Sequence, residues 1–152
     1  MSPRKDRTAV VLDTNVLIAY YLSKKKDSAN SKVFLLWRTR RRLQLIVSDE
    51  VVTEYLEVLQ RLGVPQVRIN RLEERIKSRQ TVNHTKLGAR PTESRDPDDN
   101  LILATAVAGK AEYVVTNDYD LLDISEPAKK KFKFSIVTPG QFLDRLEETA
   151  LV

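Results

Sequence analysis

Short, mostly apolar runs alternate with longer amphipathic segments along the chain. Two of these runs, at positions 8–12 and 43–47, are typical of β-strands that are covered on both faces, and further strands are expected at 112–116 and 134–138. Strands that alternate with helices favour a parallel sheet joined by right-handed crossovers. The pattern therefore predicts an α/β fold, a three-layer sandwich with a central parallel sheet of four or five strands.

The segments between the strands predict helices, because their apolar residues recur every three or four positions. Ser48 or Asp49 is expected to cap one helix and Asp98 another, while Gly109 suits the left-handed position that follows a helix. Positions 80–95 are polar and are expected to form a loop with room for one short strand. The expected helices cover 15–22, 28–38, 49–62, 66–78, 98–108 and 139–146.

The composition is that of a folded, basic protein. Hydrophobic residues make up 41% of the 152 positions and charged residues 31%, which indicates a globular chain rather than a disordered one. We expect a single domain over residues 1–152 with its core at about 8–146. The 26 Lys and Arg residues outnumber the 21 Asp and Glu residues, and the net charge of +5 favours polyanionic partners without identifying one.

The residue types that the sequence lacks exclude several classes of site. The absence of cysteine excludes disulfides, thiolate nucleophiles and thiolate metal sites, and the single histidine, His84, excludes a multi-histidine zinc site. The longest apolar run, 16–22, is too short to cross a bilayer, and the charged N-terminus lacks the apolar core of a secretory signal. We therefore expect a cytoplasmic protein with no membrane contact.

Acidic residues stand close to the points where the predicted strands end. Asp13 directly follows the first strand, and Asp118 lies two residues beyond the third. Asp98 and Asp99 open the helix that precedes that third strand, while Glu54 lies on a helix side that can face the sheet. Because the carboxyl ends of parallel strands meet at one edge of the sheet, we expect these side chains to converge there.

Converging carboxylates repel one another by about 4 kcal/mol per close pair at an effective dielectric near 20, so such a cluster takes up protons or binds a cation. With oxygen ligands alone, the expected ion is Mg²⁺ or Mn²⁺. For single residues a plain alternative stays open: Asp98 as a helix cap, Glu54 as a solvated helix residue and His84 as a surface histidine. Asp13 is hardest to explain in this way, since a charge placed directly after a buried strand costs free energy.

Several enzyme classes lack their motifs here. The four isolated glycines exclude dinucleotide-binding and P-loop motifs, and no GxSxG turn exists to place a serine beside His84. A phosphotransfer receiver needs an acidic pair after the first strand, where this chain has Asp13 alone. A haloacid-dehalogenase-type phosphatase resembles the chain at Asp13, but it needs an aspartate where this chain has Asn15.

Four segments together resemble the PIN-domain nucleases, in the order expected along almost the whole chain. The resemblance is greatest to bacterial and archaeal PIN proteins that serve as toxins of toxin–antitoxin pairs. Its segments are Val10–Leu17, Ser48–Glu54, Asp96–Ala104 and Val115–Asp120, which read VVLDTNVL, SDEVVTE, DPDDNLILA and VTNDYD.

The resemblance also implies roles for single residues. Asp13, Glu54, Asp99 and Asp118 match the acidic positions that bind the metal and catalyse the reaction, and Asp99 is preferred over Asp98 because it directly precedes the segment 100–104. The polar residues Asn15 and Thr116 match those that orient the acids. The neighbouring acids Asp96, Asp98 and Asp120 are accessory candidates.

The implied reaction is hydrolysis of RNA phosphodiester bonds with Mg²⁺ or Mn²⁺, which lowers the pKa of a bound water and leaves a 5′-phosphate and a 3′-hydroxyl. The implied partners are RNA, an antitoxin acting in trans and a second copy of the chain, which we expect to meet through exposed apolar residues on helices before residue 79. Two alternatives stay open: a housekeeping RNA-processing PIN nuclease, and a PIN-fold protein that binds RNA without cutting it.

Basic clusters offer weaker candidates for RNA contact. Counterion release from a phosphate backbone would favour such contact, but arginines at a helix C-terminus also complement the helix dipole. No recognisable RNA-binding motif accompanies them. The candidates are Lys24, Lys25, Lys26, Arg38, Arg40, Arg41 and Arg42.

Overall fold

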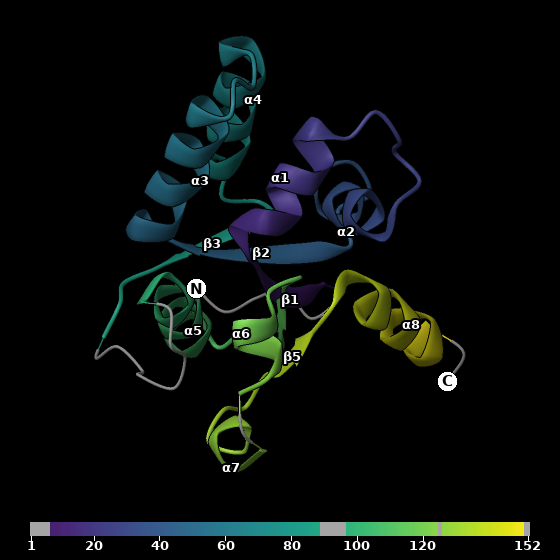
Figure 1. Ribbon diagram of the computed structural model, residues 1–152, viewed down its shortest axis with the longest axis vertical. Helices are drawn as coiled ribbons and strands as arrows, with labels where there is room; N and C mark the ends of the chain where they lie inside the picture. The colour runs from purple at the N-terminus through teal and green to yellow at the C-terminus, as the bar shows by residue number, and fades with distance from the viewer. Residues whose placement is uncertain (1–6, 89–96, 125, 151–152) are drawn as a thin grey trace.

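A five-stranded parallel sheet forms the centre of the computed structural model, which describes residues 7–88, 97–124 and 126–150 (Figure 1). The strand order is β3-β2-β1-β4-β5, and every neighbouring pair is parallel. The strands are β1 (Thr8–Leu12), β2 (Leu43–Ser48), β3 (Val82–Thr85), β4 (Tyr113–Val115) and β5 (Ser135–Val137).

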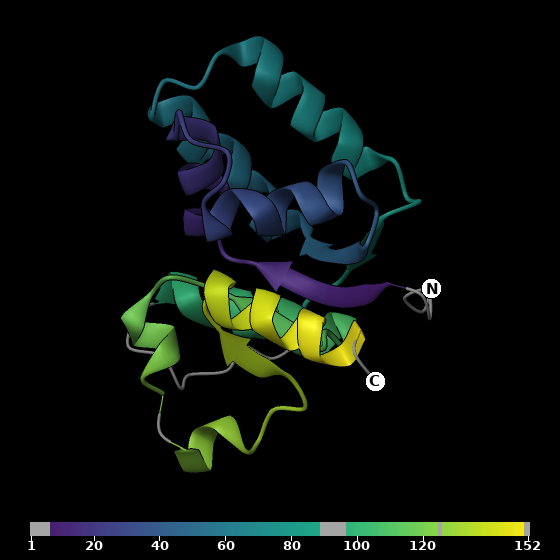
Figure 2. The ribbon, with the colours of Figure 1, turned by 90° about the vertical axis from the view of Figure 1, so that its right-hand side faces the viewer.

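Helices cover both faces of this sheet and complete a three-layer α/β sandwich. Helices α1 to α4 lie together on one side of β1 and β2, while α5 packs on the opposite side against β1, β2 and β4 (Figures 1 and 2). The last long helix, α8, packs beside α2. The helices are α1 (Thr14–Leu22), α2 (Ala29–Arg38), α3 (Asp49–Arg61), α4 (Gln66–Lys77), α5 (Pro97–Gly109), α6 (Tyr119–Leu122), α7 (Glu126–Lys129) and α8 (Pro139–Ala150).

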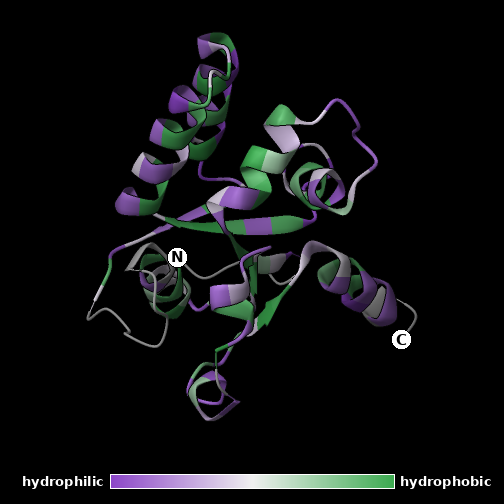
Figure 3. Cartoon of the chain, viewed as in Figure 1, coloured by the Kyte–Doolittle hydropathy of each residue, from purple (hydrophilic) through white to green (hydrophobic). Residues whose placement is uncertain are grey.

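The core lies on both faces of the central strands, where Figure 3 shows hydrophobic residues on β1 and β2. All six residues of β2 are buried, as are four of the five residues of β1. This double burial is the physical reason that their sequences are runs of apolar residues instead of alternating patterns. No helix in the described ranges is long and apolar enough to cross a membrane.

The chain reverses its direction across the sheet at β1. From β1 it moves outward through β2 to β3, then returns to the other side of β1 to form β4 and β5. The connections on the two sides leave the sheet in opposite senses, and such a switch point opens a crevice at the carboxyl ends of the strands. Asp13, the residue that follows β1, therefore stands at the position where parallel α/β sheets place their sites.

The structure confirms the four strands expected from the sequence and adds β3 within the expected loop at 80–95. Ser48, not Asp49, caps α3, because its side-chain oxygen accepts a hydrogen bond of 3.2 Å from the Val51 backbone N–H. Strand β3 was ambiguous in the sequence because its residues at 82–85, VNHT, have little apolar character.

Two expectations about α5 were wrong. The helix begins at Pro97, so Asp98 lies within its first turn and does not cap it. Gly109 ends the helix without a left-handed conformation, and it is Lys110 that has a positive φ of 54°. The glycine is needed for packing, since a Cβ atom there would lie 2.1 Å from Cγ2 of Ile46 in β2.

We predict that Gly109→Ala lowers the free energy of unfolding by about 1–3 kcal/mol, because the added methyl group overpacks the contact between α5 and β2. Gly140→Ala is the matched control: it also lies in a helix, and its nearest neighbour would be 4.0 Å away. That control is expected to be neutral or stabilising, since alanine favours helix over glycine. Urea denaturation measures both, and equal stability of the two variants would contradict the packing argument.

Candidate active site

Asp13 lies at the carboxyl end of β1 with only 7% of its surface exposed. Its backbone N–H donates to the carbonyl of Val115 at 2.9 Å, which continues the pairing of β1 with β4 by one residue. Its side-chain oxygen Oδ2 accepts hydrogen bonds from Thr116 Oγ1 at 2.7 Å and from Asn15 Nδ2 at 3.1 Å. The sheet register thus brings together residues that are about a hundred positions apart.

Thr116 and Asn15 also hold the segment that follows β4. The Thr116 hydroxyl accepts the backbone N–H of Asp118 at 2.9 Å while donating to Asp13. Asn15 Oδ1 accepts both the backbone N–H and the side-chain Nδ2 of Asn117 at 3.2 Å, and Asn117 Nδ2 donates on to Asn30 at 2.7 Å. These bonds fix the path of the chain between Asp13 and Asp118.

Glu54 reaches the same edge from α3. Its Oε2 accepts a 2.7 Å hydrogen bond from the hydroxyl of Thr14, the residue after Asp13. The next residue of the helix, Tyr55, is fully buried and donates its hydroxyl to the carbonyl of Leu12, the last residue of β1. Two consecutive residues of α3 therefore contact two residues that flank Asp13, so Glu54 does not point into solvent as an isolated helix residue would.

The electrostatics of the site centre on the carboxyl group of Asp13, whose pKa rises from 3.8 to about 6. Burial is the largest cause, because it disfavours the charged form, and repulsion from Glu54 and Asp118 adds to it. The hydrogen bonds from Thr116 and from the Thr14 backbone lower the pKa but do not cancel the rise. These carboxylates therefore interact electrostatically, and a cation at this edge would relieve the cost of ionising Asp13.

The remaining acids differ in how the structure places them. Asp118 is half-buried at the start of α6, where its Oδ1 accepts the backbone N–H of Asp120 at 2.9 Å. Asp120 is half-buried one residue into the same helix. Asp98 and Asp99 lie in the first turn of α5, and their side chains are outside the described part of the structure. Asp96 lies outside the described residues altogether.

The donor set at this edge consists of carboxylate, hydroxyl and amide oxygens, which suits hard cations such as Mg²⁺ and Mn²⁺. Among the side chains that the structure describes, no three of His, Cys, Asp and Glu lie close enough to hold one ion. Asp99 lies in the first turn of α5, which contacts α3. The chemistry of the described donors fits a divalent ion.

The basic candidates fall into two groups, one before α2 along the chain and one from its last residue onward. Lys26, in the loop with Lys24 and Lys25 between α1 and α2, donates to the Tyr20 carbonyl at 2.7 Å and lies 4.0 Å from the Tyr20 ring centroid. The residues Arg38, Arg40, Arg41 and Arg42 come just before β2, at the amino edge of the sheet, whereas the acids lie at the carboxyl edge. The arginine candidates therefore lie at the edge of the sheet opposite the acids.

His84 lies within the edge strand β3 and is half-buried. A ring nitrogen of His84, Nε2, lies 2.9 Å from the carbonyl oxygen of Ile76 near the end of α4. The side chain therefore ties α4 to the edge strand and takes no part in the acidic site.

Sequence reasoning missed the residues that hold the site together. Thr14, Tyr55 and Asn117 make the contacts described above, and Ser48 Oγ lies 2.9 Å from Thr105 Oγ1, joining the start of α3 to α5. Thr14 and Asn117 stand next to Asp13 and Asp118 in the resembling segments, so their position offered a signal. The roles of Tyr55 and Thr105 depend on contacts between distant elements, which no local pattern reveals.

With this geometry established, comparison with known proteins identifies the family. Residues 9–120 match the PIN domain family, and the chain belongs to it. PIN domains are nucleases.

Among solved structures, the chain is similar to a crystal structure of VapBC2 from Rickettsia felis bound to a DNA fragment from their promoter. The TM-score is 0.54 at 14% sequence identity, and the match covers 86% of this chain and 98% of the other. Comparison with curated proteins gives no match. At this identity the structural likeness establishes the fold.

We predict that Asp13→Asn stabilises the metal-free protein above pH 6 by up to about 3 kcal/mol, the free energy that corresponds to a pKa raised from 3.8 to about 6. Because the folded-state pKa is raised, ionisation costs the folded protein more than the unfolded chain. The advantage of the variant should shrink as the pH falls from 6 to 4 and vanish below 4, where both states carry the proton.

Urea denaturation of both proteins in a chelating buffer, from pH 4 to pH 8, measures this difference. A stability difference that stays constant across the range would contradict the raised pKa. Asp144→Asn, at an exposed position, supplies the control for the change from carboxylate to amide.

Proposed function

We propose that this PIN-domain protein is an endoribonuclease that depends on Mg²⁺ or Mn²⁺ and acts as the toxin of a toxin–antitoxin pair. The observation that carries the proposal is the buried carboxylate of Asp13, held by Thr116 and Asn15 and raised in pKa by burial and by Glu54 and Asp118. A buried acid with a perturbed pKa, at the switch point of a parallel sheet, is characteristic of a functional site.

Asp13, Glu54, Asp99 and Asp118 would hold the metal. A bound ion would supply a water activated for attack and positive charge beside the phosphate. The chain's own contribution is orientation: Thr116 and Asn15 keep Asp13 Oδ2 in place, and the Thr14 hydroxyl holds Glu54 Oε2. Such supporting contacts are worth about 10–100-fold in metal affinity in other metal sites.

RNA as the substrate is supported by the net charge of +5 and by the family's nuclease character. Because no motif for reading bases is present in the sequence, we expect recognition to depend on the backbone and shape of the RNA. A cleavage assay with RNA, run with Mn²⁺ and with EDTA, tests both the substrate and the need for metal.

We predict that the purified protein cleaves single-stranded RNA with Mn²⁺ and that EDTA abolishes the cleavage. Asp13→Asn and Asp99→Asn should each lower the rate by more than about 100-fold, because each removes a charge that holds the ion. Asp144→Asn, on the exposed face of α8, is the matched control and should retain the parent rate. Gel analysis of labelled RNA and circular dichroism separate lost activity from lost fold.

Near-normal cleavage by Asp13→Asn would refute the assignment of the site. Tight RNA binding by a folded parent protein that cuts no RNA would instead favour the alternative of a binding protein without nuclease activity.

Assignment as a toxin is supported by the four segments that resemble PIN toxins and by the likeness to VapBC2. In such a pair an antitoxin inhibits the nuclease activity in trans. We also expect a homodimer, in which two copies of the chain meet through exposed apolar residues on the helices before residue 79. Leu22, Leu62 and Val67 are the large apolar residues most exposed there, at 51%, 43% and 57%.

We predict that induced expression of the parent protein arrests bacterial growth, because uncontrolled cleavage depletes cellular RNA, and that Asp13→Asn relieves the arrest. Growth curves at matched protein levels measure the effect, with Asp144→Asn as the control that should still arrest growth. Harmless expression of a protein that cleaves RNA in vitro would favour a housekeeping RNA-processing nuclease.

A further inference from the structure

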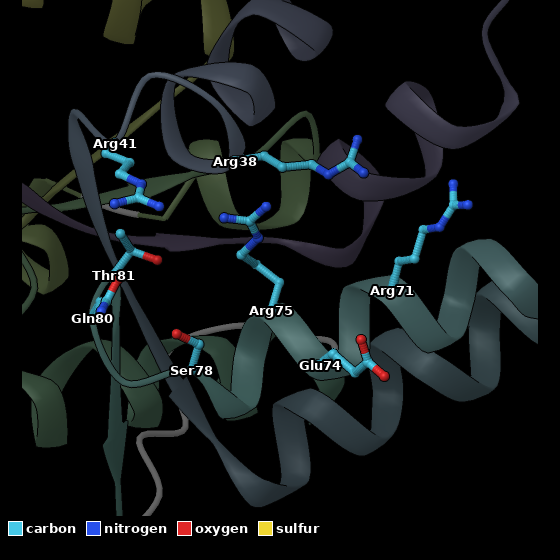
Figure 4. Close-up of a pocket in the computed structure, with 8 residues that line it drawn as sticks. All are labelled: Arg38, Arg41, Arg71, Glu74, Arg75, Ser78, Gln80 and Thr81. Carbon is cyan, nitrogen blue, oxygen red and sulfur yellow. The ribbon is translucent and has the colours of Figure 1, made fainter.

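A cavity of about 330 Å³ opens between α4, the end of α2 and the loop before β3 (Figure 4). Four arginines line it from different parts of the chain. Arg38 ends α2, Arg41 follows it in the loop before β2, and Arg71 and Arg75 lie one turn apart on α4. The other lining residues are Glu74, Ser78, Gln80 and Thr81.

The positive charge of this arginine pocket is not balanced by the protein. In the part of the chain that the structure describes, none of the four arginines forms an ion pair, and Glu74 is the one acidic residue among those lining the cavity. Arg38 Nη1 donates to the neutral hydroxyl of Tyr20 at 3.4 Å. Four guanidinium groups against one carboxylate leave a concentrated positive potential in a concave space, which attracts anions.

The helix dipole accounts for only half of this cluster. Arg38 and Arg75 lie in the last turns of α2 and α4, where positive charge is stabilising. Arg71 lies in the middle of α4, and like charges one turn apart disfavour the helix. Arg41 has a φ of 53°, a left-handed conformation that favours glycine over a residue with a side chain. Both therefore occupy positions that carry a conformational or electrostatic cost.

The chemistry of the lining favours phosphate. Each guanidinium group can bind a phosphate oxygen pair through two parallel N–H donors. Several guanidinium groups in one pocket can therefore contact both free oxygens of a phosphodiester. Every side chain that lines the cavity is polar, so it offers no apolar groove for an amphipathic peptide helix. A nucleic-acid backbone meets these conditions better than a protein segment does.

The arginine pocket lies at the amino edge of the sheet, since Arg41 precedes β2 and Thr81 precedes β3. Strand β2 spans six residues, so about 20 Å of sheet separates this edge from the acids at the other. We propose that the arginine pocket binds a backbone phosphate of an RNA whose scissile bond lies at the acidic edge. This inference rests on the proposed RNA substrate and adds a second, remote contact to it.

The test compares two double variants that remove the same charge. Arg71→Gln/Arg75→Gln alters the pocket, and Arg61→Gln/Lys130→Gln removes two exposed charges that do not line it. Binding of a fluorescent 20-nucleotide RNA is measured in EDTA, where no cleavage occurs, from 50 to 300 mM salt. We expect the pocket variant to bind about tenfold more weakly at 100 mM salt, with a slope of log K against log salt that is lower by about 1–2. The control variant should change affinity less than twofold.

Equal affinities of the two variants would overturn the proposal. Polyglutamate that displaces the RNA as well as unlabelled RNA of equal charge would assign the pocket to an acidic protein partner and overturn it too. If inorganic phosphate binds the parent tightly and RNA affinity does not depend on RNA length, the pocket is a site for a free anion and the proposal is overturned.

The length of the RNA separates this inference from the proposed nuclease function. A trinucleotide is too short to reach from the acidic edge to the pocket, so with Mn²⁺ present the pocket variant should cleave the 20-nucleotide RNA with a lower kcat/KM and cleave the trinucleotide as the parent does. If the parent cleaves RNA but the pocket variant loses kcat/KM equally for both lengths, the arginine pocket is not a remote contact. If the parent cleaves no RNA while binding still depends on the pocket, the nuclease function fails and the pocket stands.

Discussion

The carboxylate of Asp13 is buried at the end of the central strand, and the surrounding structure compensates for that burial. An isolated charge in this position would cost several kcal/mol, so it is either hydrogen-bonded, protonated or paired with a cation. The protein uses the first two: Thr116 and Asn15 donate to Oδ2, and the pKa rises to about 6. Near neutral pH the site remains partly uncompensated, and a divalent ion would supply the missing charge.

The topology of the sheet creates this constraint. Because β1 lies between β2 and β4, the residue after it is covered by the connections on both sides of the switch point. The same arrangement brings Thr116 one residue beyond the pairing of Leu12 with Val115, and it lets α3 place Glu54 against Thr14. Tyr55 hydrogen-bonds from α3 to the Leu12 carbonyl. The packing of α3 therefore also fixes the position of Glu54 relative to Asp13.

The site acids and the arginine pocket lie at opposite edges of the sheet. Asp13, Glu54 and Asp118 are at the carboxyl edge, and the arginines that line the pocket are at the amino edge. Within the described residues, this keeps the pocket arginines away from the carboxylates, where they would compete with a metal ion. A long polyanion can contact both edges, whereas a short one can occupy either edge alone.

The sequence by itself predicted four of the strands and six of the helices in their order along the chain, the parallel sheet, and Asp13 as the residue to explain. It did so because burial on both faces and helical periodicity leave local sequence patterns, whereas β3, α6 and α7 are too short or too polar to leave one. The order of the strands, the bonds of Thr116 and Asn15 to Asp13, the link from Tyr55 to Leu12 and the approach of Gly109 to Ile46 were decided by tertiary structure. So was the joining of Arg38 and Arg41 to Arg71 and Arg75 in one pocket. Apart from the bond of Asn15 to Asp13, these contacts join residues about thirty to one hundred positions apart, and a local sequence pattern does not indicate which distant elements will meet.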